Sequence, residues 1–218
     1  TDTSDRPGEE AASVRGSQGP MAGTGDYRYV RLEEMSPWVP RAVLTAEDGD
    51  FFFYEGINPV TLTDAIIRNI REDEIVLGAS TISMQLVKML FLDHERVFSR
   101  KIQEAFLVYL MEHRVPVSKD RILELYLNVV ELGPGVYGID HAARYYFSKG
   151  PANLTAGEAT WLASILPAPK RYHRYFERGR ISDGWFARMV GLYEIMLERG
   201  RMTAEEYAEA IRRPPQFR

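Results

Sequence analysis

The sequence predicts a mainly α-helical domain. Along several segments apolar residues recur at intervals of three and four, and helix-start signals precede some of these segments. No segment of the sequence shows sustained alternation of apolar and polar residues, and no strand–helix repeat is visible. The chain has 218 residues, of which 45% are hydrophobic, so it contains enough apolar material for one core of ordinary size. We therefore expect a single helical domain.

The start of the chain differs in composition from the rest. Residues 1–26 are rich in Gly, Ser, Asp and Glu and have almost no large apolar side chain, which is typical of a flexible polar linker. We place the domain at residues 27–218, with its C-terminal helices within residues 183–212. Because the first residue is Thr1, we expect the chain to be part of a longer protein. No run of eighteen apolar residues occurs, so we expect any membrane anchor outside this chain.

Charge and composition exclude some classes of function. The net charge is −4, which argues against a broad nucleic-acid-binding surface. The chain has no cysteine, which excludes disulfides and thiolate metal sites. The histidines lack the mutual spacing of metal ligands, and we predict no zinc site at His94, His113, His141 or His173.

The first half of the chain contains four predicted elements, a short extended segment and three helices. Residues 27–30 form a short extended segment, and residues 35–46 form a turn that leads into a helix ending near Glu47. Residues 61–70 place apolar side chains at helical spacing. Residues 80–91 do the same, and their other face is polar, with Thr81, Gln85 and Lys88.

The second half of the chain contains clearer helix boundaries. A helix is predicted over residues 99–114, and Ser118 is predicted to cap the next one, which ends at the cluster 133–135. Capping-box spacing, in which a Thr is followed three residues later by a Glu, begins two further helices. These pairs are Thr155 with Glu158 and Thr203 with Glu206.

Candidate chemistry begins at Glu47. Residues 46–56 place four carboxylates beside four consecutive aromatic side chains. Apolar neighbours raise the pKa of a carboxylate towards the range of a general base, so Glu47 is a candidate for that role. The alternative is a helix end followed by an aromatic anchor in the core. Composition alone favours this alternative, because perturbed carboxylates also occur for structural reasons.

Three later blocks change that balance. They are GASTISMQLVK at residues 78–88, RKIQE at 100–104 and KDRILELYLN at 119–128. Together with residues 46–56, and in this order, they resemble the pattern of glycosyltransferase family 51. The family includes the transglycosylase domains of bifunctional penicillin-binding proteins and their monofunctional relatives. The resemblance covers roughly residues 40–169.

The resemblance implies a lysozyme-like helical fold and an inverting, processive transfer. The implied substrate is an undecaprenyl-diphosphate-linked disaccharide-peptide, lipid II. Because the donor sugar leaves as a diphosphate, the site has to supply a base for the acceptor hydroxyl and positive charge for the phosphates. By resemblance, Glu47 is the base and Asp48 orients the loop or a neighbouring basic group. The cations implied for the phosphates are Lys88, Arg100 and Lys101.

Glu104 matches a second glutamate of the family. We expect it to assist catalysis by organising the cations or by binding a divalent ion such as Mg²⁺ or Mn²⁺, and we expect no organic cofactor. The other implied substrate-binding residues are Phe51, Tyr54, Ser80, Thr81, Gln85, Glu124 and Asn128. Structural alternatives stay open: an ion pair between Arg100 and Glu104, an N-cap at Ser80, and a solvated helix face for the later residues.

The family also carries a lipid-facing apolar region, which corresponds here to about residues 57–77. This implies a membrane-facing subregion, with ordinary core packing as the alternative. The basic and aromatic stretch 170–178 can contact lipid headgroups or glycan, but packing over the core is the favoured interpretation. Implied partners are lipid II, the growing glycan strand, the membrane surface and other cell-wall synthesis proteins, with no nucleic acid. The implied location is the bacterial cell envelope, at the periplasmic face of the inner membrane.

The sequence departs from the family pattern at a few positions. Tyr54 stands where His is expected, Ala79 where a second Gly is expected, Met89 where Asn is usual and Asp64 where Arg is frequent. These departures support one alternative, a scaffold that binds lipid II without turnover. Another alternative is a lysozyme-like hydrolase, but the predicted phosphate-binding cations have no evident use in hydrolysis. Glycosyl transfer is the leading expectation.

Overall fold

A computed structural model describes residues 28–55, 80–91, 98–115 and 117–217, and for residues 98–102 it describes the backbone alone. Within these ranges the chain is mainly helical, which confirms the predicted fold class. None of the described helices has the length and apolar character needed to span a bilayer. The predicted linker 1–26, the predicted helix 61–70 and the whole apolar region 57–77 lie outside the described residues.

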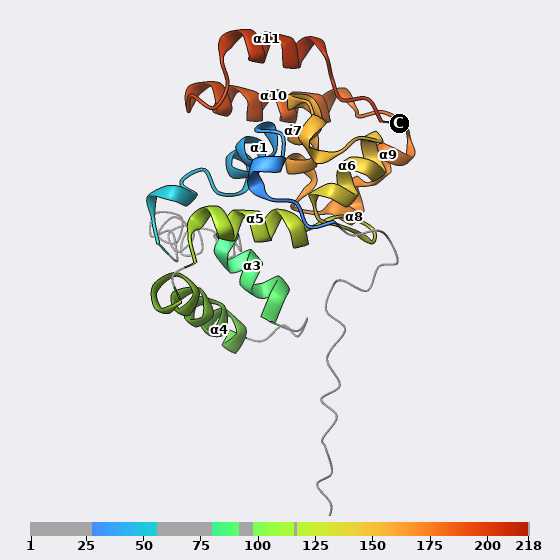
Figure 1. Cartoon of the computed structure of the whole chain (residues 1–218). Coiled ribbons are helices and arrows are strands. Elements are labelled where there is room, and N and C mark those ends of the chain that lie inside the picture. Colours follow the sequence, from blue (N-terminus) through green and yellow to red (C-terminus); the bar gives the residue numbers. More distant parts are fainter. Residues whose placement is uncertain (1–27, 56–79, 92–97, 116, 218) are drawn as a thin grey trace, which may run out of the picture.

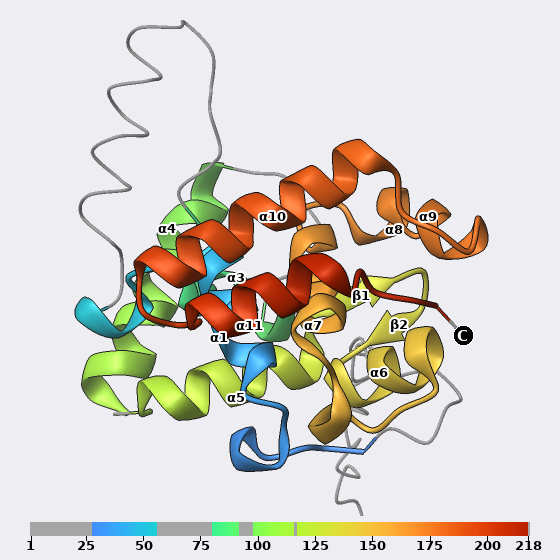
Figure 2. The ribbon, with the colours of Figure 1, turned by 90° about the horizontal axis from the view of Figure 1, so that it is seen from above.

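The centre of the fold is helix α7 (Ala156–Ile165). Nearly all of its side chains are buried, which agrees with its apolar sequence on every face. Helix α1 (Trp38–Glu47) packs along α7, and α10 (Asp183–Glu198) contacts both. Helix α11 (Ala204–Arg212) lies beside α10 on the outer side (Figure 2). The carboxyl end of α1 is therefore supported by the core on one side.

A second group of helices lies at the end of the molecule opposite α11 (Figure 1). It consists of α3 (Ile82–Phe91) and α4 (Phe98–Tyr109), and α5 (Lys119–Val129) packs against α3. Helix α4 continues into a π-helical turn, η3 (Leu110–Arg114). The helix predicted over residues 99–114 is confirmed, with a wider last turn.

The region after α5 contains the described strands, which the sequence did not predict. Strands β1 (Glu131–Gly133) and β2 (Val136–Tyr137) pair in antiparallel orientation around the predicted helix stop at 133–135. Gly135 has φ of 72°, a conformation that favours glycine in a tight turn. The hairpin contacts α6 (Ile139–Phe147) and α8 (Pro169–Tyr172).

Local capping signals are mostly confirmed. The Ser118 hydroxyl accepts the Arg121 N–H, and both predicted capping boxes are formed at α7 and α11. At α3 the N-cap is Thr81 rather than Ser80, because the Thr81 hydroxyl accepts the Met84 N–H at 3.2 Å. Thr81 is also buried, which contradicts the solvated face that was the structural alternative for it.

Shorter elements complete the described chain. They are η1 (Leu32–Glu34), η2 (Phe51–Phe53), η4 (Pro151–Asn153) and α9 (Arg174–Glu177). Within the stretch 170–178, Tyr175 is buried and its ring lies 5.2 Å from that of Trp185. At that residue, packing over the core is the interpretation that the structure supports.

Candidate active site

Glu47 is the last residue of α1, and it faces side chains from two other helices. The buried residues Val39, Ala42 and Val43 hold α1 in the core. From α3, the Gln85 side-chain amide donates a hydrogen bond to Glu47 Oε2 at 2.9 Å. From α5, the Tyr126 hydroxyl donates to Gln85 Oε1 at 3.0 Å. A chain of neutral donors therefore reaches Glu47 from α5 through α3.

The surroundings of Glu47 favour its protonated form. Burial raises the pKa of Glu47 above its ordinary value of 4.5. The hydrogen bond from Gln85 lowers it, the charge of Asp48 raises it, and the charges of Arg188 and Lys88 lower it, but burial prevails. A carboxylate with a raised pKa is better matched to accepting a proton near neutral pH. Arg188 belongs to α10 and was missed, because it lies outside the motif blocks.

Asp48 connects η2 to the start of α3. Its Oδ2 accepts the Tyr54 hydroxyl and, at 3.1 Å, the backbone N–H of Ile82 in the first turn of α3. A carboxylate at a helix N-terminus is electrostatically favourable. Burial raises the pKa of Tyr54, and the charge and hydrogen bond of Asp48 raise it further, so Tyr54 stays a neutral donor. Tyr54 thus supplies the hydrogen bond that a His can also donate, without its positive charge.

A buried ion pair supports the aromatic run and was also missed. Lys119 Nζ lies 3.0 Å from Glu112 Oε2, and both side chains are largely buried. The same ammonium lies 4.5 Å from the ring centre of Phe51 and 4.7 Å from that of Tyr54. Ser83 donates a hydrogen bond to Glu112 Oε1 at 2.5 Å. Sequence reasoning placed Lys119 in a motif block but had no signal for Glu112, which lies between the blocks.

Phe51 has no exposed surface. A fully buried ring that contacts Lys119 supports the site. Phe51 therefore packs as the aromatic anchor that was the alternative interpretation, and its contact with substrate stays a prediction. Its neighbour Phe53 is 85% exposed, so the same run points both into the core and into solvent.

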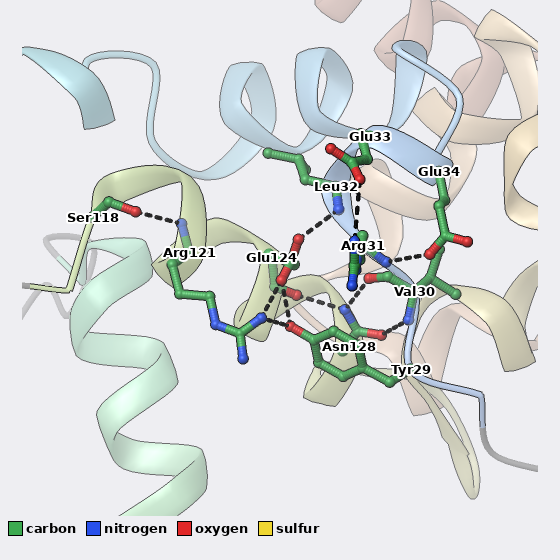
Figure 3. Close-up of polar contacts among 10 residues, drawn as sticks. All are labelled: Tyr29, Val30, Arg31, Leu32, Glu33, Glu34, Ser118, Arg121, Glu124 and Asn128. Atoms are coloured by element: carbon green, nitrogen blue, oxygen red, sulfur yellow. Dashed lines mark hydrogen bonds and ion pairs between the residues drawn. The ribbon is translucent and has the colours of Figure 1, made fainter.

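Glu124 and Asn128 lie together on α5, and both form hydrogen bonds to the N-terminal segment (Figure 3). Glu124 accepts hydrogen bonds from the Tyr29 hydroxyl, the Leu32 N–H and Arg121. Asn128 exchanges two hydrogen bonds of 2.8 Å with the backbone of Val30. These side chains fasten residues 29–32 to α5, so this segment is held without strand pairing. Asn128 is buried, which contradicts a solvated helix face at that position. Substrate binding by either residue stays a prediction.

The predicted phosphate-binding residues are only partly described. Lys88 is exposed near the end of α3, and its charge acts on Glu47. Arg100 and Lys101 lie in α4, but their side chains are outside the described part of the chain, as are Ala79 and Asp64. Ser80 is half-buried just before α3.

Glu104 is 1% exposed, and the side chain of Arg100, its partner in the alternative interpretation, lies outside the described part of the chain. Among the described residues, no group of three or more His, Cys, Asp or Glu side chains is arranged to hold a metal ion. The divalent cation at Glu104 stays a prediction.

A family model described as Transglycosylase matches residues 19–190, which include every residue predicted for the site. The chain belongs to the transglycosylase family. This confirms the resemblance that the ordered sequence blocks predicted. The neutral hydrogen-bond chain that ends at Glu47 and the bridge made by Asp48 lie within the residues that this family model matches.

Named relatives agree with this family. The chain is 38% identical over 208 residues to penicillin-binding protein 1A of Aquifex aeolicus, an overlap of 94% of this chain and 28% of that protein. It is 42% identical over 149 residues to the biosynthetic peptidoglycan transglycosylase of Ralstonia nicotianae, which is 68% of this chain and 63% of that protein. For the protein of the same description in Bordetella pertussis the identity is 41% over 161 residues, 72% of this chain and 66% of that protein. The chain thus spans less than two thirds of the length of each.

Proposed function

We propose that this chain is a peptidoglycan glycosyltransferase, which polymerises lipid II into glycan strands and releases undecaprenyl diphosphate. The observation that carries the proposal is Glu47, a glutamate with a raised pKa at the end of α1, held by a neutral amide in a chain of the transglycosylase family. Relatives described as biosynthetic peptidoglycan transglycosylases support the choice of reaction.

In this reaction Glu47 accepts the proton of the acceptor sugar's 4-hydroxyl group. The freed oxygen forms a bond to the anomeric carbon of the donor, and the bond from that carbon to the diphosphate breaks in the same displacement. The diphosphate leaves with the electron pair, and a single displacement inverts the anomeric centre. Gln85 keeps the carboxylate in place through its hydrogen bond of 2.9 Å. Lys88, Arg100 and Lys101 are assigned to the charge of the departing diphosphate.

We also propose that the domain contacts a membrane surface, where it binds its lipid substrate. Helices α3 and α4 lie at the end of the molecule opposite α11 (Figure 1), and several of their large apolar side chains are exposed. Phe91 is 65% exposed, Phe106 59% and Tyr109 50%. Exposed apolar groups of this size are typical of a membrane or protein contact. Together with the relatives' peptidoglycan role, they support a location at the periplasmic face of the inner membrane, within the cell envelope.

Polymerisation by the purified domain tests the proposal. Fluorescent lipid II in detergent is supplied to the wild type, to Glu47→Gln and to a control, Glu194→Gln, which changes an exposed glutamate of α10. We expect a ladder of glycan products on a gel from the wild type and the control, and none from Glu47→Gln. A ladder that persists in Glu47→Gln contradicts the role of the base.

The same assay separates the alternatives. Lipid II binding by the wild type without any ladder would move the assignment to a scaffold, and degradation of finished glycan would move it to a hydrolase. The cation predicted at Glu104 has no step in the mechanism above. Its requirement is tested by adding a chelator and then restoring Mg²⁺ or Mn²⁺.

A further inference from the structure

We infer that Arg201, in the turn between α10 and α11, is a positioning residue for Glu47. It forms hydrogen bonds with the chain on both sides of Glu47 and holds the end of α1 from the turn after α10, whereas Gln85 contacts Glu47 from α3. The inference rests on the proposed function, in which Glu47 is the general base. Arg201 lies beyond residues 19–190, the part that the family model matches.

The turn that carries Arg201 is fixed by local backbone bonds. Helix α10 ends at Glu198, and Gly200 adopts φ of 64°, a left-handed conformation that glycine accepts readily. The Gly200 N–H donates to Leu197 O at 3.1 Å, and the Arg201 N–H donates to Met196 O at 2.7 Å. This pair of bonds is a Schellman motif. It reverses the chain, and the side chain of Arg201 reaches the end of α1.

The guanidinium of Arg201 joins two points around Glu47. One nitrogen, Nη1, donates to the Thr45 hydroxyl at 2.9 Å, and the other, Nη2, donates to the carbonyl oxygen of Gly49. Thr45 lies two residues before Glu47 and Gly49 two residues after it. Because the guanidinium is planar and rigid, binding both acceptors fixes their separation. Thr45 is itself anchored, since its hydroxyl donates to Arg41 O at 2.7 Å.

Arg201 acts where the helix itself gives no support. The last carbonyl groups of a helix, and those just after it, have no helical partner. Binding of the Gly49 carbonyl by Arg201 supplies one and restrains the turn that follows Glu47. Gln85 holds the Glu47 carboxylate from α3, whereas Arg201 holds the flanking backbone from the turn after α10. The direction of the Glu47 side chain depends on both.

Arg199 makes a weaker contact with the same turn. Its Nη1 lies 2.7 Å from Asp50 Oδ1, but the two side chains are 42% and 53% exposed. Ion pairs at this exposure contribute little to stability. We therefore assign the positioning role to Arg201 and expect only a small effect from changing Arg199.

Steady-state kinetics of three variants test the inference. In Arg201→Gln we expect kcat to fall by about 10- to 100-fold, because a displacement of about 1 Å at a reacting group has effects of this order. KM should stay within about twofold, since Arg201 is assigned no substrate contact. The kcat of Arg201→Lys should lie between those of the wild type and Arg201→Gln, because one ammonium group replaces only part of the hydrogen bonding of the guanidinium. The control Arg213→Gln removes an exposed arginine just after α11, paired with Glu209 at 2.9 Å, and should keep wild-type kinetics. Wild-type kcat in Arg201→Gln, or a rise of KM alone, would overturn the inference.

Amide hydrogen exchange of residues 44–52, measured without substrate, separates this inference from the proposed function. We expect faster exchange in Arg201→Gln than in the wild type or Arg213→Gln. Equal exchange overturns the inference whatever the activity. Faster exchange in a domain whose wild type makes no glycan overturns the proposed function and leaves Arg201 as the residue that holds the end of α1. If Arg201→Gln does not fold, Arg201→Lys is read by the same two criteria.

Discussion

Glu47 and Glu124 are two glutamates held by side chains or backbone groups from distant parts of the chain, yet their pKa values move in opposite directions. Burial raises the pKa of Glu47, and the neutral donor Gln85 only partly offsets it. Burial also disfavours the charged form of Glu124, but a tyrosine hydroxyl, a backbone N–H and an arginine outweigh it and lower its pKa. The number and charge of the donors therefore decide the direction in which the pKa of a carboxylate moves. A raised pKa suits a proton acceptor, and a lowered pKa suits a carboxylate that binds two segments together.

The two regions also contribute to stability in opposite pH ranges. The contribution of Glu47 is fully present below its unfolded pKa near 4.5 and is lost as pH rises through its raised folded pKa. The contribution of Glu124 is present above its unfolded pKa and is lost as pH falls through its lowered folded pKa. Charge in the site therefore opposes folding, whereas charge at the fastening point of residues 29–32 favours it.

The largest expected change in stability concerns Glu112. Unlike Glu47, whose hydrogen-bond donor is neutral, this carboxylate is paired with the charged ammonium of Lys119. In Lys119→Met the carboxylate loses its ion pair while it stays buried, and we expect the free energy of unfolding to fall by about 3–5 kcal/mol. Urea denaturation at pH 7 measures this. The double variant Glu112→Gln, Lys119→Met should recover part of the loss, because no buried charge then remains unpaired. A loss below about 1 kcal/mol in Lys119→Met would show that the pair behaves as an exposed one.

The second prediction changes the donor to Glu47. In Gln85→Met the hydrogen bond that lowers the pKa of Glu47 is absent, so this pKa rises further. The acidic limb of the pH–rate profile should move to higher pH, and kcat at pH 7 should fall by about tenfold. The control Gln216→Met, at an exposed position, should leave the profile unchanged. A limb that moves to lower pH would contradict the direction assigned to this hydrogen bond.

The third prediction weakens the fastening point. Glu124→Gln keeps the size of the side chain but removes the charge that accepts three hydrogen bonds, so unfolding free energy at pH 7 should fall by about 1–2 kcal/mol. The difference should shrink as pH falls below the unfolded pKa, where the wild-type side chain also becomes neutral. Urea denaturation at several pH values checks this. A rise in KM without a loss of stability would instead support the predicted substrate contact of Glu124.

The smallest prediction concerns the stability of the site. Glu47→Gln should raise the unfolding free energy at pH 7 by up to about 1 kcal/mol, because the charge that burial disfavours is removed. The gain should disappear below pH 4.5, where the wild-type carboxyl is neutral in both states. Thermal unfolding of the two proteins at pH 7 and pH 4 measures it. A destabilised variant at pH 7 would mean that Glu47 is a structural carboxylate like Glu124.

The sequence by itself determined the helical class, several helix starts and the family. A capping interaction such as Thr155 with Glu158 joins residues three positions apart, so it is visible in the sequence and recurs in the structure. The family followed from ordered motif blocks, and the same blocks named Glu47 and Asp48. The turn at residues 133–135 was predicted only in part, because its composition indicated a helix end but not the hairpin that forms around it.

Only the tertiary structure decided what surrounds the candidate base. Gln85 is separated from Glu47 by 38 residues and Arg201 from Gly49 by 152, and no local pattern encodes such pairs. The pKa of Glu47 depends on burial, and burial depends on helices packing from across the chain. Because desolvation and long-range hydrogen bonds exist only after those helices assemble, the sequence could name the carboxylate but could not fix its chemistry.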